Sequence, residues 1–192
     1  MDAPQTDIID QLAGIEPGSR LDTVRRQRIE ARTHAQASYD ALFTPVAEAG
    51  FPLAERRAVA AFVALLHNQP DCAAHYTAAL DHEALRAIRF EAARAQATGP
   101  FGNYPPGPLT AENRPGKVFH ADPTLLGPHL AAALTHTHML LFHPRDAAPA
   151  HLQALVDAGW STPAIVTLSQ LVAFLSFQIR VVAGFRAMAQ AQ

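Results

Sequence analysis

Three side chains that can carry proton-transfer or thiol chemistry lie close together in the sequence: Cys72, His75 and Tyr76. Cys72 is the only cysteine, and it precedes His75 by three residues, so both lie on one face of a helix. Pro70 suits the first position of that helix, which puts Cys72 in the first turn, where the helix dipole favours a thiolate. Asp71 opposes that effect. The stretch is therefore a candidate redox, nucleophilic or acid–base centre.

Glu55 is the candidate partner of His75. It stands 20 residues earlier, on the preceding helix, and can approach His75 if the chain folds back at "NQPD", residues 68–71. A carboxylate that holds an imidazole forms a workable proton relay. The alternative is structural, with Glu55 as an exposed first-turn residue favoured by the dipole and His75 as a hydrogen-bonded core histidine.

The 10 histidines do not form a metal-binding pattern. His136 and His138 are two residues apart, so on a helix they point about 200° apart and cannot share a metal. His67 and His75 lie on different helices without a carboxylate or thiolate that would complete a metal site. The chain also lacks a glycine-rich phosphate loop and a Gly-x-Ser-x-Gly motif. We expect neither a metal nor a cofactor.

Composition favours a single cytoplasmic domain. The chain has 192 residues, a formal net charge of −2 and one cysteine, so we expect no internal disulfide and no nucleic-acid partner. The first residues, "MDAPQTDIIDQLAG", lack the order of a secretion signal. The apolar stretch 165–185 is interrupted by five polar residues, so it predicts a core or subunit-interface helix and not a membrane span.

The pattern predicts an all-α fold, because alanine is abundant and long stretches lack both proline and β-branched alternation. A connector with five prolines and four glycines, residues 99–116, separates a first half (about 1–98) from a second half (117–192). We expect no helix in this connector. The expected helices lie at 7–14, from Ser19 to Thr44, from Pro52, from Pro70, from Asp81, at 128–143, up to Gly159, and at 163–188.

Two segments resemble each other across the halves. "EAGFPLAERRAVAAFVALL" (48–66) and "DAGWSTPAIVTLSQLVAFL" (157–175) align without gaps, which suggests two related helical units packed pseudo-symmetrically.

The last helix is apolar on more sides than one domain readily covers, so we expect a homo-oligomer. Within it, Arg180 is expected to be paired with a carboxylate or several backbone carbonyls, because a lone buried guanidinium would be very costly. Arg25, Arg28 and Arg32 share one face and predict a solvated face or pairing with carboxylates of a neighbouring subunit.

The residues from Glu55 to His75 resemble those of the alkyl hydroperoxidase D-like group, which includes the carboxymuconolactone decarboxylases and many peroxidase-related, antioxidant proteins. The shared features are a Glu-Arg start to an apolar helix, a short break, and a histidine in the following helix. The C-terminal part, "LLFHPRDAAPAHLQALVDAGWSTPAIVTLSQLVAFLSFQIRVVAGF", is similar to a branch of longer proteins with a carboxymuconolactone decarboxylase domain. The resemblance covers most of the chain and implies an all-helical, AhpD-like multihelical bundle and a homo-oligomer.

The peroxidase members carry Cys-x-x-Cys-x-x-x-His after a glutamate. When His75 takes the family histidine position, Asn68 and Asp71 take the two cysteine positions and Cys72 is one residue out of register. A dithiol cycle needs an attacking and a resolving sulfur, and this chain has one. The resemblance therefore implies family roles for Glu55 and His75, with little contribution from Cys72 or Tyr76.

Three functions follow as expectations. The first is acid–base or weak redox chemistry on a small organic substrate at a Glu55–His75 pocket. The second is a non-catalytic helical oligomer that binds a ligand or a partner. The third is a hydroperoxide reductase that uses Cys72 alone. The location of Glu55 and His75 distinguishes the first two, because only the enzyme needs both in one closed pocket.

Overall fold

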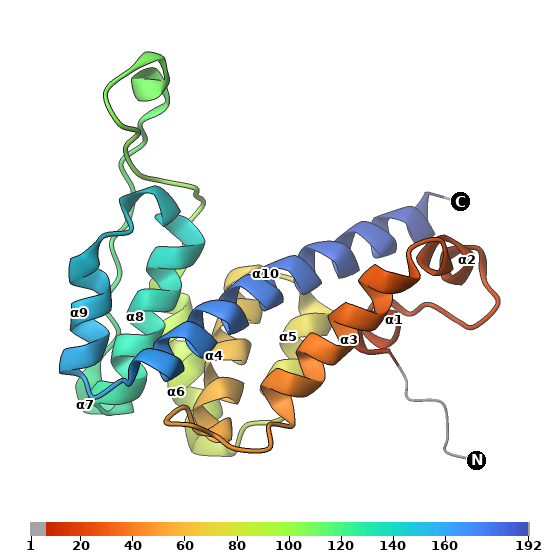
Figure 1. Cartoon of the computed structure of the whole chain (residues 1–192), viewed down its shortest axis with the longest axis horizontal. Coiled ribbons are helices and arrows are strands. Elements are labelled where there is room, and N and C mark those ends of the chain that lie inside the picture. Colours follow the sequence, from red (N-terminus) through yellow and green to blue (C-terminus); the bar gives the residue numbers. More distant parts are fainter. Residues whose placement is uncertain (1–6, 192) are drawn as a thin grey trace.

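The computed structural model describes residues 7–191, and these residues are mostly helical (Figure 1). They contain no β-strand, only an isolated bridge between Gly102 and Arg114. The predicted all-α class is confirmed. The α-helices are α1 (Ile8–Ala13), α2 (Arg20–Arg26), α3 (Ile29–Phe43), α4 (Leu53–Leu66), α5 (Pro70–Thr77), α6 (His82–Ala95), α7 (Pro123–Leu126), α8 (Pro128–Phe142), α9 (Pro149–Asp157) and α10 (Thr162–Gln190).

Helices α4 and α10 form the centre of the core. The predicted stripe on α4 is buried, with Val59, Phe62 and Val63 fully enclosed, and Leu168 and Leu171 of α10 are equally enclosed. Helices α5 and α6 pack on α4, while α8 and α9 lie near the start of α10 and α1–α3 lie near its end (Figure 1). One hydrophobic cluster therefore joins residues from both halves of the chain.

Helix starts follow the capping chemistry of the sequence. The side chains of Ser19, Asp81 and Ser161 accept hydrogen bonds from backbone N–H groups of the first turns of α2, α6 and α10. Pro70 is the first residue of α5, as expected. Gly159, which follows α9, has φ of +94°, the left-handed conformation that glycine adopts at a helix end.

The helix predicted from Ser19 to Thr44 is two helices, α2 and α3, separated at Gln27 and Arg28. Arg25 explains part of the difference, because its guanidinium is buried and donates to Asp7 (2.6 Å) and Asp10 (2.8 Å). Arg32 pairs with the same carboxylate, Asp10, at 2.5 Å, so the arginines on both sides of the break converge on one group of acids.

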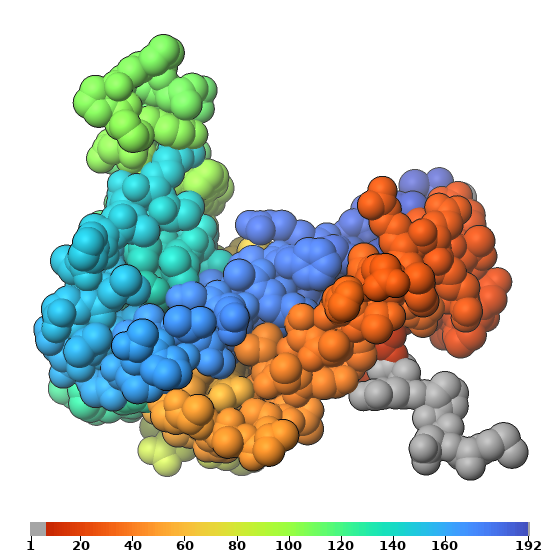
Figure 2. Space-filling view, viewed as in Figure 1, coloured from red at the N-terminus to blue at the C-terminus, as the bar shows by residue number. Residues whose placement is uncertain are grey.

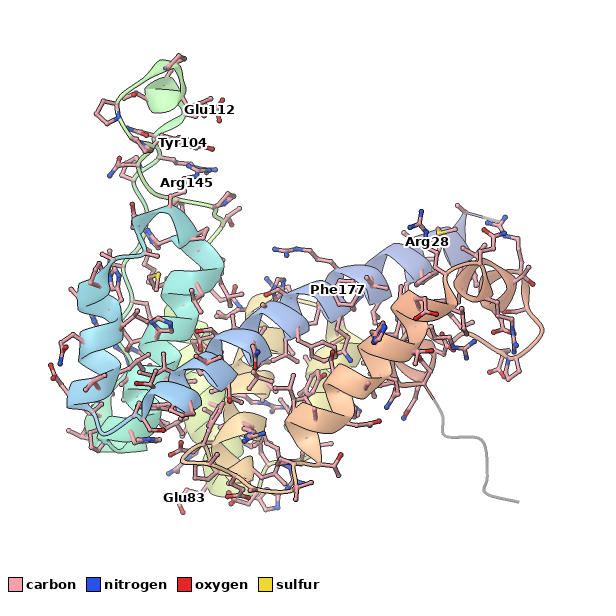
Figure 3. All side chains as sticks on the ribbon, in the orientation of Figure 1. Arg28, Glu83, Tyr104, Glu112, Arg145 and Phe177 are labelled. Atoms are coloured by element: carbon pink, nitrogen blue, oxygen red, sulfur yellow. The ribbon has the colours of Figure 1, made fainter. Side chains whose placement is uncertain are left out.

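The arginine face is therefore mostly an internal network, and the expected pairing with a neighbouring subunit is not needed to explain it. Its third member, Arg28, is exposed at the break between α2 and α3 (Figure 3).

The connector is an arm that projects from the body beside the end of α8 (Figures 1 and 2). Gly102 and Arg114 exchange two backbone hydrogen bonds at 2.9 and 3.2 Å, and Arg145 lies over the Tyr104 ring at 4.2 Å. The expectation that no helix forms in it is wrong in detail, because Pro108–Glu112 is a 3₁₀ helix at the tip. A local hydrogen bond stabilises this short helix, because the Thr110 hydroxyl accepts from the Gly107 N–H.

The two similar segments meet in space. Phe51, before α4, and Trp160, before α10, occupy equivalent positions in the alignment, and their rings pack edge-on with centroids 4.9 Å apart. Gly50 and Gly159, also equivalent, both have positive φ. The two segments therefore lie against each other at the starts of α4 and α10.

Helix α10 has the length and mean hydropathy (1.7) of a membrane span, and 44% of that window is buried within the chain. The core helix of a folded domain has the same properties, so this observation alone does not indicate a membrane.

Candidate functional site

Glu55 lies in the first turn of α4, and its carboxylate accepts a hydrogen bond from His129 Nδ1 at 2.8 Å. His129 lies at the second position of α8, after Pro128, and its ring stacks on Trp160 with centroids 4.2 Å apart and planes 7° apart. Trp160 Nε1 also donates to the His129 carbonyl at 3.0 Å. Glu55 therefore connects α4 to α8, and the expected hydrogen bond between Glu55 and His75 is not formed.

His75 belongs to a cluster of aromatic side chains between α3, α5 and α10. Its Nε2 hydrogen-bonds the Tyr39 hydroxyl at 3.1 Å, and its ring meets the Tyr76 ring edge-on at 4.8 Å between centroids. Burial lowers the pKa of His75 and raises the pKa of Tyr39. The Tyr76 hydroxyl donates to Oε1 of Gln178, which is fully buried. We call Tyr39, His75, Tyr76 and Gln178 the tyrosine cluster.

Cys72 is fully buried beside this cluster. Burial, and next Asp71, raise the pKa of its thiol to about 11, with Arg186 acting in the opposite direction. Only about one thiol in 10⁴ is then ionised at pH 7. A reactive cysteine needs an accessible thiolate, so the geometry does not favour the single-cysteine peroxidase. Tyr76 is equally unsuited to proton transfer, because burial raises its pKa far above neutrality.

None of the four residues predicted from the sequence lines any of five cavities and grooves found within residues 7–191. Glu55 and His75 are each half-buried, at separate places in the fold. The structure therefore does not bring the predicted Glu55–His75 pocket together.

A cavity of about 640 Å³ lies where the end of α4, the end of α8, the base of the arm and the middle of α10 converge. Its volume is within the range of small-molecule sites. Most of its wall is apolar and comes from Leu66, Leu140, Leu141, Phe142 and Val172. Because these residues belong to both halves of the chain, the cavity forms only when the halves pack together.

Two nitrogen-bearing side chains line this cavity, His67 and Arg180. We call it the His67–Arg180 cavity. His67 is the C-cap of α4, and its Nε2 is enclosed without a hydrogen-bond partner. Burial, and next the charge of Arg180, lower the pKa of His67, which favours the neutral imidazole at pH 7.

Arg180 is exposed, and within residues 7–191 it has no ion pair. The prediction that it would be paired is wrong. The helical rotation of α10 turns Arg180 outward and buries Gln178 instead. Gln178 accepts a hydrogen bond from the Tyr76 hydroxyl. The guanidinium is therefore a cation at the edge of an apolar cavity without an anion beside it.

Sequence reasoning missed His67 and His129. No local pattern identifies either one, because their partners are remote in the chain: His129 meets Glu55 across 74 positions, and His67 meets Arg180 on the last helix. Over the described residues, no group of three or more His, Cys, Asp or Glu side chains has an arrangement that could hold a metal ion.

Comparisons with known proteins give no match. A scan against models of protein families, a search of curated proteins and a search of solved structures each found nothing similar to this chain. The resemblance to the alkyl hydroperoxidase D-like group therefore stays a prediction from sequence motifs.

Proposed function

We propose that this chain is an AhpD-like, carboxymuconolactone-decarboxylase-related helical protein without thiol chemistry, and that it binds a small organic carboxylate in the His67–Arg180 cavity. One observation carries the proposal: an exposed guanidinium without an ion pair lies at an apolar cavity that also contains an imidazole nitrogen without a partner. The binding alternative is preferred over acid–base catalysis because Glu55 and His75 lie apart.

The charge of the site favours an anion. Arg180 is always protonated, and its planar guanidinium matches a carboxylate in a two-hydrogen-bond geometry. The lowered pKa of His67 favours its neutral form at pH 7, so Arg180 supplies the positive charge of the site. The His67 ring can donate a hydrogen bond to the ligand if it turns about the Cβ–Cγ bond. At an exposed edge one such ion pair contributes about 1 kcal/mol or less, and more when the ligand excludes water.

The apolar walls define the rest of the ligand. Leu140, Phe142 and Val172 present hydrocarbon surface, and each Å² of apolar area removed from water contributes roughly 25 cal/mol. A ligand with a carboxylate at Arg180 and a ring or short chain along these walls uses both features. Aromatic and short aliphatic monocarboxylates are therefore the expected class.

Two features support the descent. Helices α4 and α5 form the predicted pair of helices, with Glu55 and Arg56 at its start and His75 on its second helix. The contact between Phe51 and Trp160 supports a bundle built from two related halves. In this proposal the thiol positions of the family are lost, and the single remaining Cys72 is a packing residue.

The binding experiment uses the full chain and benzoate, followed by isothermal titration at pH 7. Arg180→Gln is expected to weaken benzoate binding about tenfold, which corresponds to about 1.4 kcal/mol. The matched control is Arg89→Gln, which removes an exposed arginine of α6 outside the cavity and is expected to leave affinity unchanged. Equal affinity for benzamide and benzoate, or an unchanged affinity in Arg180→Gln, would contradict the proposal.

We also propose that α10 pairs with α10 of a second copy. Residues 162–179 contain no charged side chain, and Val166 and Phe177 are about half exposed. Phe177 points outward from α10 (Figure 3). This ridge has an apolar groove on each side, one against α9 and one against α3, and both grooves include Gln170 and Ala173. A ridge beside its own grooves can be self-complementary, as a two-fold dimer requires.

Sedimentation velocity at micromolar concentration tests this pairing. The wild type is expected to sediment as a dimer or larger assembly, and Phe177→Glu is expected to shift it toward the monomer. Leu109→Glu is the control, because Leu109 is half exposed at the tip of the arm and lines neither groove. A monomeric wild type would exclude this interface.

A further inference from the structure

A second cavity, of about 250 Å³, lies between α8, α9 and the segment that returns from the arm. It is separate from the His67–Arg180 cavity and shares no lining residue with it. Its walls include Phe119, Met139 and Leu155, with His136 on the α8 side. We call it the His136 cavity. Its volume equals about eight water molecules at roughly 30 Å³ each, which is enough for a ligand with a single ring.

His136 is an unusual buried group. Its side chain is only 5% exposed, and both ring nitrogens are enclosed without a hydrogen-bond partner among residues 7–191. A neutral imidazole has one donor and one acceptor, and buried polar groups of folded proteins nearly always have partners. The lack of any partner for either nitrogen therefore requires an explanation beyond packing.

Several other polar groups that line the cavity already have partners, while His120 lies at its exposed edge. His138 Nε2 donates to the Ala95 carbonyl at 3.0 Å, and His143 is bonded to Asp146 and to the Lys117 carbonyl. Thr135 Oγ1 donates to one backbone carbonyl and accepts from one N–H. His136 is thus the lining group on α8 that has hydrogen-bonding capacity left for a ligand.

The surroundings disfavour an anionic ligand. Asp146 lines the same cavity, and the Coulomb repulsion of its carboxylate disfavours a second negative charge. Burial lowers the pKa values of His136 and His138 to about 4, so both rings are neutral at pH 7 and offer no positive charge. The ligand that fits the apolar walls and the neutral His136 ring best is uncharged, mostly apolar, and able to make one hydrogen bond.

We propose that the His136 cavity is a second small-molecule site, which takes a small uncharged aromatic alcohol of the phenol type. The hydroxyl group exchanges a hydrogen bond with one His136 nitrogen after a turn of the ring about Cβ–Cγ. The aromatic ring packs against Phe119, Met139 and Leu155, where ring and sulfur contacts with an aromatic are favourable.

The test compares phenol with toluene, which has nearly the same shape but no hydroxyl group. Ligand-observed saturation-transfer NMR on the full chain at pH 7 is expected to show phenol binding at least tenfold tighter than toluene. Ala154→Trp places a large side chain at the exposed edge of the cavity and is expected to abolish binding of both. Ala74→Trp, on an exposed position of α5, is the control and is expected to change nothing.

His136→Phe removes the hydrogen-bonding nitrogens and keeps a ring at this position. It is expected to abolish the preference for phenol over toluene. Circular dichroism verifies its fold, and Ala154→Trp keeps the test valid if His136→Phe does not fold. Equal binding of phenol and toluene in the wild type, or phenol binding that survives Ala154→Trp, would overturn the proposal. Arg180→Gln must leave phenol binding unchanged, so failure here is distinguishable from failure of the carboxylate site.

Discussion

The tyrosine cluster and the His67–Arg180 cavity both contain a histidine beside α10, yet they differ in how their polar groups are satisfied. In the cluster, His75 bonds Tyr39 and Tyr76 bonds Oε1 of Gln178, and the one buried atom left over is Gln178 Nε2, which borders none of the cavities named above. In the cavity, the His67 nitrogen has no partner among residues 7–191, and Arg180 faces open space. Groups that satisfy one another stabilise a fold, whereas groups left without partners beside a cavity indicate a ligand.

The largest effect on stability is expected from a substitution within the tyrosine cluster. Tyr76 is 3% exposed, so Tyr76→Ala removes a buried aromatic ring and leaves Gln178 without its hydrogen bond. The free energy of unfolding is expected to fall by about 3–5 kcal/mol. Urea denaturation measures it. Tyr104→Ala, on the arm, is the matched control and should cost less than about 1 kcal/mol, because Tyr104 contacts mainly Arg145.

Arg180→Gln should leave the unfolding free energy nearly unchanged and affect ligand affinity alone. A Tyr76→Ala variant as stable as the wild type would contradict the stabilising role of the tyrosine cluster. A strongly destabilised Arg180→Gln variant would contradict the role of Arg180 in ligand binding alone.

Thiol reactivity gives the next largest effect. Because the pKa of Cys72 is about 11, two units above its ordinary value, its thiolate fraction is about 100-fold below that of an ordinary thiol. Labelling of the native protein with Ellman's reagent at pH 7 is expected to be at least that much slower than labelling in denaturant. Equally fast labelling in both states, together with reduction of a hydroperoxide, would restore the single-cysteine peroxidase.

Acid should destabilise the fold through its buried histidines. Burial lowers the pKa values of His136 and His138 from 6.5 to about 4, so the unfolded chain binds protons before the folded chain does. The stability from these neutral rings is present above pH 6.5 and is lost as the pH falls toward 4, by at most about 1.4 kcal/mol per pH unit for each histidine. His67 and His75 shift in the same direction.

Urea midpoints measured from pH 8 to pH 4.5 test this pH dependence. Replacing His136 by Gln should reduce the slope, while His34→Gln, at an exposed position of α3, should leave it unchanged. A stability that is flat across this range would show that the four rings are solvated.

Periodicity and capping chemistry were sufficient to predict the all-α class and most helix starts. Ser161 and Asp81 act through neighbours three residues away, and such local signals are visible in a sequence. The break between α2 and α3 could not be predicted, because it accompanies ion pairs of Arg25 and Arg32 with acids brought close only by folding.

The site was harder to predict for the same reason. Glu55 was correctly placed at the start of a helix, but its partner His129 comes from the other half of the chain. Apolar periodicity placed α10 in the core, yet a difference of two positions decides that Gln178 is buried and Arg180 exposed. Sequence patterns indicate which residues can do chemistry, while the packing of remote helices decides which of them share a cavity.

A crystal structure of the protein soaked with 4-bromobenzoate tests the central claim most directly, because anomalous scattering locates the bromine atom directly. The carboxylate is expected within about 3 Å of the Arg180 guanidinium. The bromine is expected among Leu140, Phe142 and Val172. Bromine density at any other place, with the His67–Arg180 cavity filled only by water, would contradict the account.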